Sequence, residues 1–359
     1  MSSKVIDLRS DTITRPTAGM RQAIANAEVG DDCIDIDPTM QRLQDALAER
    51  LGKEAAIFMP SGTMTNQVGV RVHCGPGDEF ICEAECHILN YEQGAYAQLS
   101  GVAARAVQGD FGVIDPAQLV DLIRPENEHL VRTRLVCLEN THNRGGGHVQ
   151  PYENVAEICN WAHENGLRTH LDGARLFNAA IASGIEAAQW AQHFDTVSIC
   201  FSKGMGAPVG SALAGTKEMI ALARRHRKLF GGAMRQAGII AAGALYALEN
   251  HVERLAEDHA NAQILADAIN SVDGLRTKPV QTNLVTFYVD RSLCTAQELV
   301  AALKDHGIRV LATTRELVRA VTHLDVTTEE VEQAAAIIPQ VVEKITSGSY
   351  ASAEQGATY

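Results

Sequence analysis

The stretch Asp195-Thr-Val-Ser-Ile-Cys-Phe-Ser-Lys-Gly-Met-Gly206 joins an apolar run to a lysine, Lys203, set among small residues. The run up to Phe201 contains β-branched residues and no Gly or Pro, which predicts a buried strand. The small residues around Lys203 end that strand, so the lysine amine can point into a cleft. A lysine at a strand end can equally extend to water, and the rest of the chain has to decide between these interpretations.

Predicted strands and helices alternate from the N-terminus up to this stretch. Apolar runs predict strands at residues 55–59, 79–82, 102–107, 135–138, 167–171 and 196–201. Amphipathic or capped segments predict helices at residues 17–28, 38–51, 64–74, 88–99, 115–123 and 151–165. This order predicts an α/β fold, in which a large domain contains a mostly parallel, helix-covered sheet. In such sheets ligands bind beyond the carboxyl ends of the strands.

The pattern changes after residue 216. We predict a helical block over 217–271 with turns near 231–232 and 250–251, then strands at 284–289, 309–311 and 319–322 and helices at 295–306 and 327–345. These elements predict a smaller C-terminal α/β domain. We therefore expect a large domain with an N-terminal arm over residues 1–250, a small domain over 251–346, and a polar tail over 347–359 that frays.

The composition is typical of a soluble globular protein. The 359 residues carry a formal net charge of −13, which argues against a protein that binds nucleic-acid phosphates. A basic run at residues 224–228 is the exception, and we interpret it as the polar part of a helix near a subunit contact. The N-terminus lacks the apolar core of a signal peptide, and no window has the roughly twenty apolar residues that a membrane helix needs.

Eight cysteines are spread along the chain, and Cys82 and Cys86 are the closest pair. No second pair follows at the spacing of a zinc site, so metal binding is the weaker interpretation and reduced thiols the stronger. We expect a cytoplasmic protein that binds neither a metal, a nucleic acid nor a membrane.

Three further motifs follow predicted strands and therefore belong to the same edge of the sheet. Pro60-Ser-Gly-Thr63 offers hydroxyls and free amides suited to a phosphate, although a plain helix cap by Thr63 explains it as well. His87 is either an ordinary loop histidine or a group that stacks on an aromatic ring or transfers a proton. Asp172 ends a buried strand, where a carboxylate needs a partner: Arg175, or the protonated ring nitrogen of a cofactor.

The phosphate turn, the carboxylate and the lysine occur in the order expected of pyridoxal phosphate enzymes. In that interpretation Lys203 forms a Schiff base with the cofactor, Asp172 keeps its ring nitrogen protonated, and residues 60–63 bind its phosphate. An NAD-dependent enzyme is poorly supported, because no Gly-x-Gly-x-x-Gly motif opens a helix after an early strand.

Longer matches identify the family that the chain resembles. They are Asp7-Leu-Arg-Ser-Asp-Thr12, Gly30-Asp-Asp32, Pro60-Ser-Gly-Thr-Met64, Leu138-Glu-Asn-Thr-His-Asn143, His170-Leu-Asp-Gly-Ala-Arg-Leu-Phe-Asn178, Ser202-Lys-Gly-Met-Gly-Ala-Pro-Val-Gly-Ser211, Met234-Arg-Gln-Ala-Gly238 and Val321-Thr-His-Leu-Asp325. In this order they are similar to the L-threonine aldolases, which belong to the β-eliminating lyases of pyridoxal phosphate fold type I. The resemblance covers almost the whole chain and implies the aspartate-aminotransferase-like fold.

The resemblance also implies roles for individual residues. The cofactor would be held by Ser61, Gly62, Thr63, His87, Asp172, Arg175, Lys203 and, from a neighbouring subunit, Arg235. The substrate would be held by Ser10, Arg175 and Arg319, with the arginine fork on its carboxylate. The catalytic residues would be Lys203, Asp172 and the histidines His87 and His129, either of which, or a water between them, would take the proton of the substrate hydroxyl.

The implied reaction is the reversible cleavage of L-threonine, L-allo-threonine or related β-hydroxy-α-amino acids to glycine and an aldehyde, in a homo-oligomer that is a dimer or a tetramer. Two alternatives stay open: another pyridoxal phosphate reaction (β-elimination, racemisation or transamination) and a catalytically silent relative. One departure bears on the substrate side chain, because Ile34 stands where the family usually has an active-site tyrosine. Ala233 replaces a third glycine, and residues 143–148 form a longer, glycine-rich segment than in many relatives.

Overall fold

The computed structural model describes residues 5–348. Their contacts divide them into two units. The large unit contains residues 15–145 and 149–253, and the small unit contains residues 5–14, 146–148 and 254–348. The predicted domain limits at residues 250 and 346 stay a prediction, and residues 349–359 of the predicted tail lie outside the described part of the chain.

The large unit is built from alternating strands and helices. Its strands are β2 (Ala55–Met59), β3 (Asp78–Glu83), β4 (Ala103–Val107), β5 (Arg132–Glu139), β6 (Arg168–Gly173), β7 (Thr196–Cys200) and β8 (Ser211–Gly215). Its helices are α1 (Ala18–Ala25), α2 (Pro38–Arg50), α3 (Gly62–His73), α4 (His87–Asn90), α5 (Ala95–Ser100), the 3₁₀ turn η1 (Pro116–Leu119), α6 (Tyr152–Glu164), α7 (Leu176–Ser183), α8 (Ala187–Ala191), α9 (Lys217–Leu229) and α10 (Gly238–Asn250).

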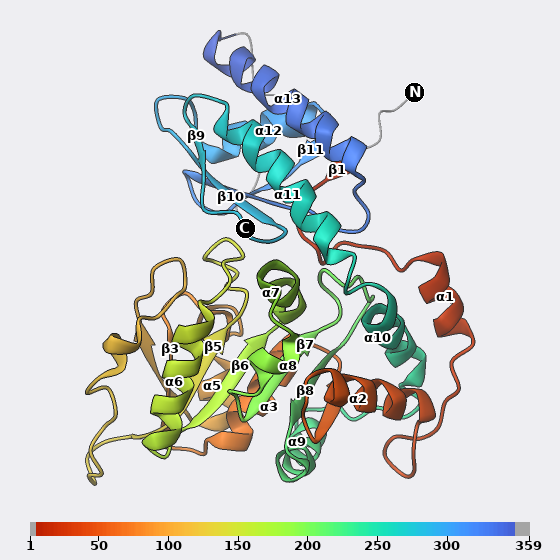
Figure 1. The fold of residues 1–359 in the computed structure, drawn as a ribbon, viewed down its shortest axis with the longest axis vertical. Helices are drawn as coiled ribbons and strands as arrows, with labels where there is room; N and C mark the ends of the chain where they lie inside the picture. Colours follow the sequence, from red (N-terminus) through yellow and green to blue (C-terminus); the bar gives the residue numbers. More distant parts are fainter. Residues whose placement is uncertain (1–4, 349–359) are drawn as a thin grey trace. The chain divides into compact units, whose positions relative to one another are not determined.

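The seven strands form one sheet in the order β2-β8-β7-β6-β5-β3-β4. Only β8 runs antiparallel to its neighbours, and the other strands share one direction. Helix α3 packs against β7 and β8, and α6 packs against β5 and β6. In Figure 1 α6 lies in front of the sheet and α3 behind it, so helices cover both faces. The predicted α/β fold with a mostly parallel sheet is confirmed.

Most predicted elements of this unit form where the sequence placed them, and two do not. Residues 88–99 were expected as one helix, but the structure has α4 and α5, separated by residues 91–94, in which φ is 56° at Gln93 and 62° at Gly94. This left-handed conformation ends helical hydrogen bonding and suits a glycine. The helix expected over 115–123 is only the short turn η1, although Asp115 caps it as expected and accepts from Ala117 N.

The small unit combines an antiparallel sheet with three helices. Its strands are β1 (Ile6–Asp7), β9 (Leu275–Thr277), β10 (Leu284–Val289), β11 (Ile308–Arg309), β12 (Leu311–Ala312) and β13 (Leu317–Val321), and its helices are α11 (Leu255–Asn270), α12 (Ala296–Asp305) and α13 (Thr328–Thr346). Four strands pair in the order β12-β13-β10-β9, and β1 pairs with β11 in parallel. The single strand predicted at 309–311 is therefore two short strands in two different sheets.

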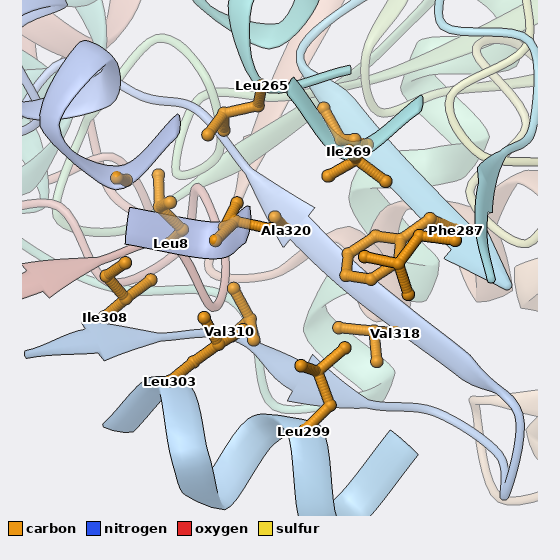
Figure 2. Packing of buried hydrophobic residues seen from close by; sticks show 14 of the residues in the cluster. Leu8, Leu265, Ile269, Phe287, Leu299, Leu303, Ile308, Val310, Val318 and Ala320 are labelled. Atoms are coloured by element: carbon orange, nitrogen blue, oxygen red, sulfur yellow. The ribbon is translucent and has the colours of Figure 1, made fainter. Parts of the chain in front are cut away.

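The core of the small unit joins both ends of the chain. Leu8 is buried among residues of the C-terminal elements, including Leu265, Ile308 and Ala320 (Figure 2). Burial of such side chains stabilises a domain by about 1.5–3 kcal/mol each relative to exposure. Ile6 and Leu8 are therefore part of the core of the small unit.

Two properties of the described residues bear on earlier expectations. The cysteines are all free thiols. Within residues 5–348, no helix is both long enough and apolar enough to span a membrane.

Candidate active site

The carboxyl ends of the central strands bring Asp172 and Lys203 to the same edge of the large sheet. Asp172 lies near the end of β6, which pairs in parallel with β7, and Lys203 follows β7 by three residues. The Asp172 side chain is buried, with 3% of the residue exposed, whereas Lys203 is half-buried. The sequence predicted a carboxylate and a lysine at neighbouring strand ends, and the structure has them there.

The environment of Asp172 favours its charged form. Burial raises the pKa of this carboxyl, but the charges of Lys203 and His87 and a hydrogen bond from Asn66 outweigh burial, so the pKa lies below its usual value. One carboxylate oxygen accepts from Nδ2 of Asn66 at 2.8 Å, and the other accepts from the backbone N–H of Ala174 at 3.1 Å. The sheet edge therefore presents a buried anion beside a lysine.

The phosphate turn lies at the N-terminus of α3. Ser61 is the N-cap, and its hydroxyl accepts from the backbone N–H of Met64 at 3.2 Å. The sequence analysis considered Thr63 for this cap, which is wrong, because the helix begins at Gly62 and Thr63 already lies in its first turn. The first amides of a helix have no helical acceptor and carry the positive end of its dipole, so they suit an anion.

Gly62 leaves space beside the turn. A Cβ at this position would lie 3.6 Å from the hydroxyl oxygen of Ser211, which is buried and without a hydrogen-bond partner among the described residues. The turn thus combines a glycine, which permits close approach to the backbone, with hydroxyl groups, as the sequence predicted.

His87 lies at the start of α4 and connects to Asp172 through two side chains that the sequence analysis missed. Its Nδ1 lies 2.9 Å from Oε1 of Glu92, and this oxygen also accepts from Nδ2 of Asn66 at 2.9 Å. Because Asn66 Nδ2 also donates to Asp172, its two hydrogens connect two buried carboxylates. Nδ1 of His87 and oxygens of Glu92 and Asp172 lie within 4.8 Å of one another. The amide hydrogens directed at both carboxylates indicate a hydrogen-bonded network there instead of a cation site.

The network continues away from the sheet edge through His170. Nε2 of His170 lies 3.3 Å from Oδ1 of Asn66, and its Nδ1 lies 2.9 Å from the hydroxyl of Thr196. Burial lowers the pKa of His170 to about 4, so the ring is neutral near pH 7. Since the Asn66 oxygen only accepts, Nε2 donates and Nδ1 accepts from Thr196. This order fixes the amide of Asn66 with its nitrogen toward the carboxylates.

A second set of contacts holds the backbone of His87. The His87 N–H donates to Oε2 of Glu139 at 2.7 Å, and Oε1 of Glu139 accepts from the N–H of Asn143 at 2.8 Å. Nη1 of Arg175 lies 3.4 Å from Oδ1 of Asn143. Arg175 is buried and begins α7, so it belongs to this edge of the sheet, as expected.

Other predicted residues lie outside this cluster. His129 lies in an exposed loop, where its ring is 3.6 Å from Glu128 and its side chain is 80% exposed. Arg235 is more than half exposed and lies 3.4 Å from Asp31. Ser10 and Arg319 belong to the small unit, and Nη2 of Arg319 lies 3.4 Å from the carbonyl of Arg9. Of the predicted residues in the described part of the large unit, His129 and Arg235 therefore do not join the network around Asp172.

Asn66 and Glu92, which were not predicted, differ in how strongly the sequence indicates them. Asn66 follows Gly62 by one helical turn of α3, so helical spacing places it on the same side as the phosphate turn. Glu92 has no such signal, because it lies in an irregular segment between α4 and α5 and its partners come from distant residues.

Pyridoxal phosphate fits the residues at this sheet edge. The buried, charged Asp172 requires a positive partner such as a protonated ring nitrogen, and the α3 N-terminus offers unpaired amides to a phosphate. Lys203 and His87, whose charges act on Asp172, lie at the same edge. These donors and acceptors match the ring, the phosphate and the aldehyde of the cofactor.

Comparison of the sequence with known proteins agrees with this chemistry. The model of the family described as β-eliminating lyase matches residues 7–292. The chain is 40% identical to low-specificity L-threonine aldolase 1 of Arabidopsis thaliana, covering 95% of this chain and 98% of that protein. It is 42% identical to the low-specificity L-threonine aldolase of Escherichia coli K12, covering 92% of this chain and 98% of that protein.

Comparison of the structure with solved structures identifies the fold. A threonine aldolase from Leishmania major superposes with a TM-score of 0.82 at 20% identity, over 94% of this chain and 99% of that one. A putative L-allo-threonine aldolase from Listeria monocytogenes superposes with a TM-score of 0.78 at 22% identity, over 95% and 97% of the two chains.

Proposed function

This chain belongs to the β-eliminating lyase family, and we propose that it is a pyridoxal phosphate-dependent aldolase. Its reaction is the reversible cleavage of L-threonine, L-allo-threonine or related β-hydroxy-α-amino acids to glycine and an aldehyde. The single observation that carries the proposal is the buried, charged Asp172 next to Lys203 at the carboxyl edge of the sheet. The similarity to low-specificity L-threonine aldolases over more than nine tenths of the chain supports the choice of reaction.

Each part of the site has a binding task. Lys203 holds the cofactor covalently, Asp172 pairs with its ring nitrogen, and the turn of Ser61, Gly62 and Thr63 binds its phosphate. His87 would stack on the ring of the cofactor, and Arg175 would bind on the side of its phenolic oxygen. Bound in this way, the cofactor withdraws electrons from the Cα–Cβ bond of the substrate as that bond breaks.

Cleavage also requires a group that accepts the proton of the β-hydroxyl. Of the two predicted histidines, His87 is the better placed, because it belongs to the buried network that contains Asp172, whereas His129 lies in an exposed loop. We assign the proton acceptor to His87, acting directly or through one water. His129 keeps only the role that the family resemblance implies.

The substrate carboxylate is assigned to Arg319, Ser10 and Arg175, as the family resemblance implies. The guanidinium fork suits a carboxylate, which takes two parallel hydrogen bonds.

We further propose that the chain acts as a homo-oligomer, a dimer or a tetramer, in the cytoplasm. Arg235 is largely exposed, as a residue that reaches the phosphate of a neighbouring subunit would be in a single chain. Ile34 and Ile36 are 81% and 60% exposed, although both are large apolar residues that a subunit contact would bury.

Incubation with L-threonine and pyridoxal phosphate tests the reaction. We expect equal amounts of glycine and acetaldehyde, and we expect Lys203→Ala to abolish turnover, whereas the exposed control Lys228→Ala keeps it. Release of 2-oxobutyrate or another keto acid, or formation of the D-amino acid, would favour the alternative reactions, and absence of any product with bound cofactor would favour a catalytically silent relative. Comparison of threonine, allo-threonine and phenylserine then measures the effect of Ile34 at the tyrosine position.

A further inference from the structure

Glu92 is a buried acidic residue for which the reaction itself has no direct task. Only 2% of the residue is exposed, and it lies in the segment between α4 and α5. Oε1 accepts from Nδ2 of Asn66 at 2.9 Å and faces Nδ1 of His87 at 2.9 Å, while Oε2 accepts from Nε2 of Gln67 at 2.5 Å. Its oxygens are thus matched to three nitrogens. Burying a carboxylate costs free energy unless hydrogen bonds or opposite charges replace its contacts with water.

The contact with Glu92 determines which nitrogen of His87 faces the rest of the site. A charged carboxylate only accepts hydrogen bonds, so the Nδ1 facing it carries a hydrogen. This leaves Nε2 as the nitrogen available for proton transfer. The ring of Tyr91, whose centroid is 5.7 Å from that of His87, and the backbone bond from His87 N to Glu139 hold the histidine from other sides.

The charges around His87 make its ring a stronger base. Burial lowers the pKa of His87, but the hydrogen bond to Glu92 and the charges of Asp172 and Glu92 outweigh burial and the opposing charge of Lys203, so the pKa lies above its usual value. Asn66 donates to both Glu92 and Asp172, so the two carboxylates that act on His87 are held at a constant separation.

We propose that Glu92 is a positioning residue, which orients the imidazole of His87 through Nδ1 and keeps a negative charge behind it. This role of Glu92 rests on the function proposed above, because that function is the basis for assigning His87 as the proton acceptor. Asn66 connects Glu92 to Asp172, so the group behind His87 and the group that pairs with the ring nitrogen form one hydrogen-bonded unit.

The decisive variant is Glu92→Gln, which keeps the size of the side chain and removes its charge. In cofactor-free protein labelled with ¹⁵N-histidine, the His87 signal, assigned with His87→Gln, should titrate at lower pH than in the wild type and lose its preference for a hydrogen on Nδ1. In the holoenzyme, kcat for threonine should fall about 10- to 100-fold, as for loss of one charge-assisted hydrogen bond, with a smaller change in KM and a shifted pH profile.

Glu79→Gln is the matched control. Glu79 is as buried as Glu92, accepts from Arg124 at 2.9 Å, and lies at the opposite, amino end of β3. The Glu79→Gln variant should have a lower free energy of unfolding, while the pH at which His87 titrates and the pH profile of kcat stay unchanged. An unchanged His87 titration in Glu92→Gln, or an equal shift in Glu79→Gln, would overturn the proposal.

Two measurements on the wild-type protein distinguish a failure of this proposal from a folding defect of the variant and from a failure of the proposed function. Where Glu92→Gln fails to fold, the wild-type protein decides, because a His87 signal that titrates at or below the ordinary value of 6.5 contradicts the proposal. Where the wild type does not cleave threonine, the proposed function fails, while the histidine titration in cofactor-free protein still reports the contact between Glu92 and His87.

Discussion

Nδ2 of Asn66 lies 2.8 Å from Oδ2 of Asp172, although the two residues are 106 positions apart in the sequence and both are buried. The same nitrogen donates to Glu92, so this one amide separates two carboxylates that would otherwise repel each other.

Replacing that amide should therefore be severe even when the shape is kept. Asn66→Asp introduces a third carboxylate where two hydrogens were donated, and we expect a loss of about 3 kcal/mol or more in the free energy of unfolding. Denaturant unfolding measures it. Asn165→Asp, at the exposed C-cap of α6, is the control and should cost little. Equal losses in the two variants would mean that Asn66 is only a packing residue.

Gly69→Ala should disturb the same network from the other side. A Cβ at Gly69 would lie 2.5 Å from Cε1 and 2.8 Å from Nδ1 of His170, closer than real Cβ contacts allow. We expect a cost of about 1–3 kcal/mol, despite the better helix propensity of Ala. A double-mutant cycle with the smaller His170→Asn checks this, because removing the ring should restore most of the loss. Additive effects of the two changes would contradict it.

Acidification should destabilise the protein through His170. Its pKa of about 4 in the folded chain lies below the ordinary 6.5, so the unfolded chain binds the proton first as the pH falls. The stability from the neutral ring is complete above pH 6.5 and is lost as the pH falls toward 4, by about 3 kcal/mol in total. Denaturation midpoints measured between pH 7 and 4 should fall less steeply in His170→Gln than in the wild type.

Arg227→Met tests a buried ion pair in the large unit. The guanidinium of Arg227 lies 2.5 Å from Oδ2 of Asp32 and donates to the carbonyl of Phe58 at 3.0 Å, and the residue is only 2% exposed. Removing it leaves the largely buried Asp32 side chain with the ion pair to Arg224 at 3.5 Å and takes a donor from the Phe58 carbonyl, so we expect a loss of about 1–3 kcal/mol. Thermal unfolding measures the loss. The exposed neighbour Arg225 is the control, and Arg225→Met should leave the midpoint within the range of surface substitutions.

The sequence was sufficient where the deciding features are local. The strands at 55–59 and 284–289 form at the predicted residues, because apolar runs between turn residues need no information from elsewhere. The same holds for Asp172 and Lys203, whose positions follow from two strand ends and a parallel sheet.

The sequence was insufficient where a partner is distant. The basic run at 224–228 was interpreted as polar helix surface, and helical spacing alone does not show that Arg227 meets Asp32, 195 positions away. Glu92 is a similar case, since its partners come from α3 and α4. The break of the helix between Asn90 and Ala95 includes two left-handed residues, Gln93 and Gly94, and a glycine permits this conformation but does not require it.

The pairing of β1 with β11 has a consequence for the order in which the protein is made. Ile6 and Asp7 leave the ribosome before the large unit, but their strand partners, Ile308 and Arg309, are synthesised some three hundred residues later. The large unit, complete by residue 253, can fold during this interval, while the first residues wait without a partner. A nascent chain that ends before Ile308 therefore lacks the partner of β1, and removal of β1 would disturb the small unit, which is completed after the large one.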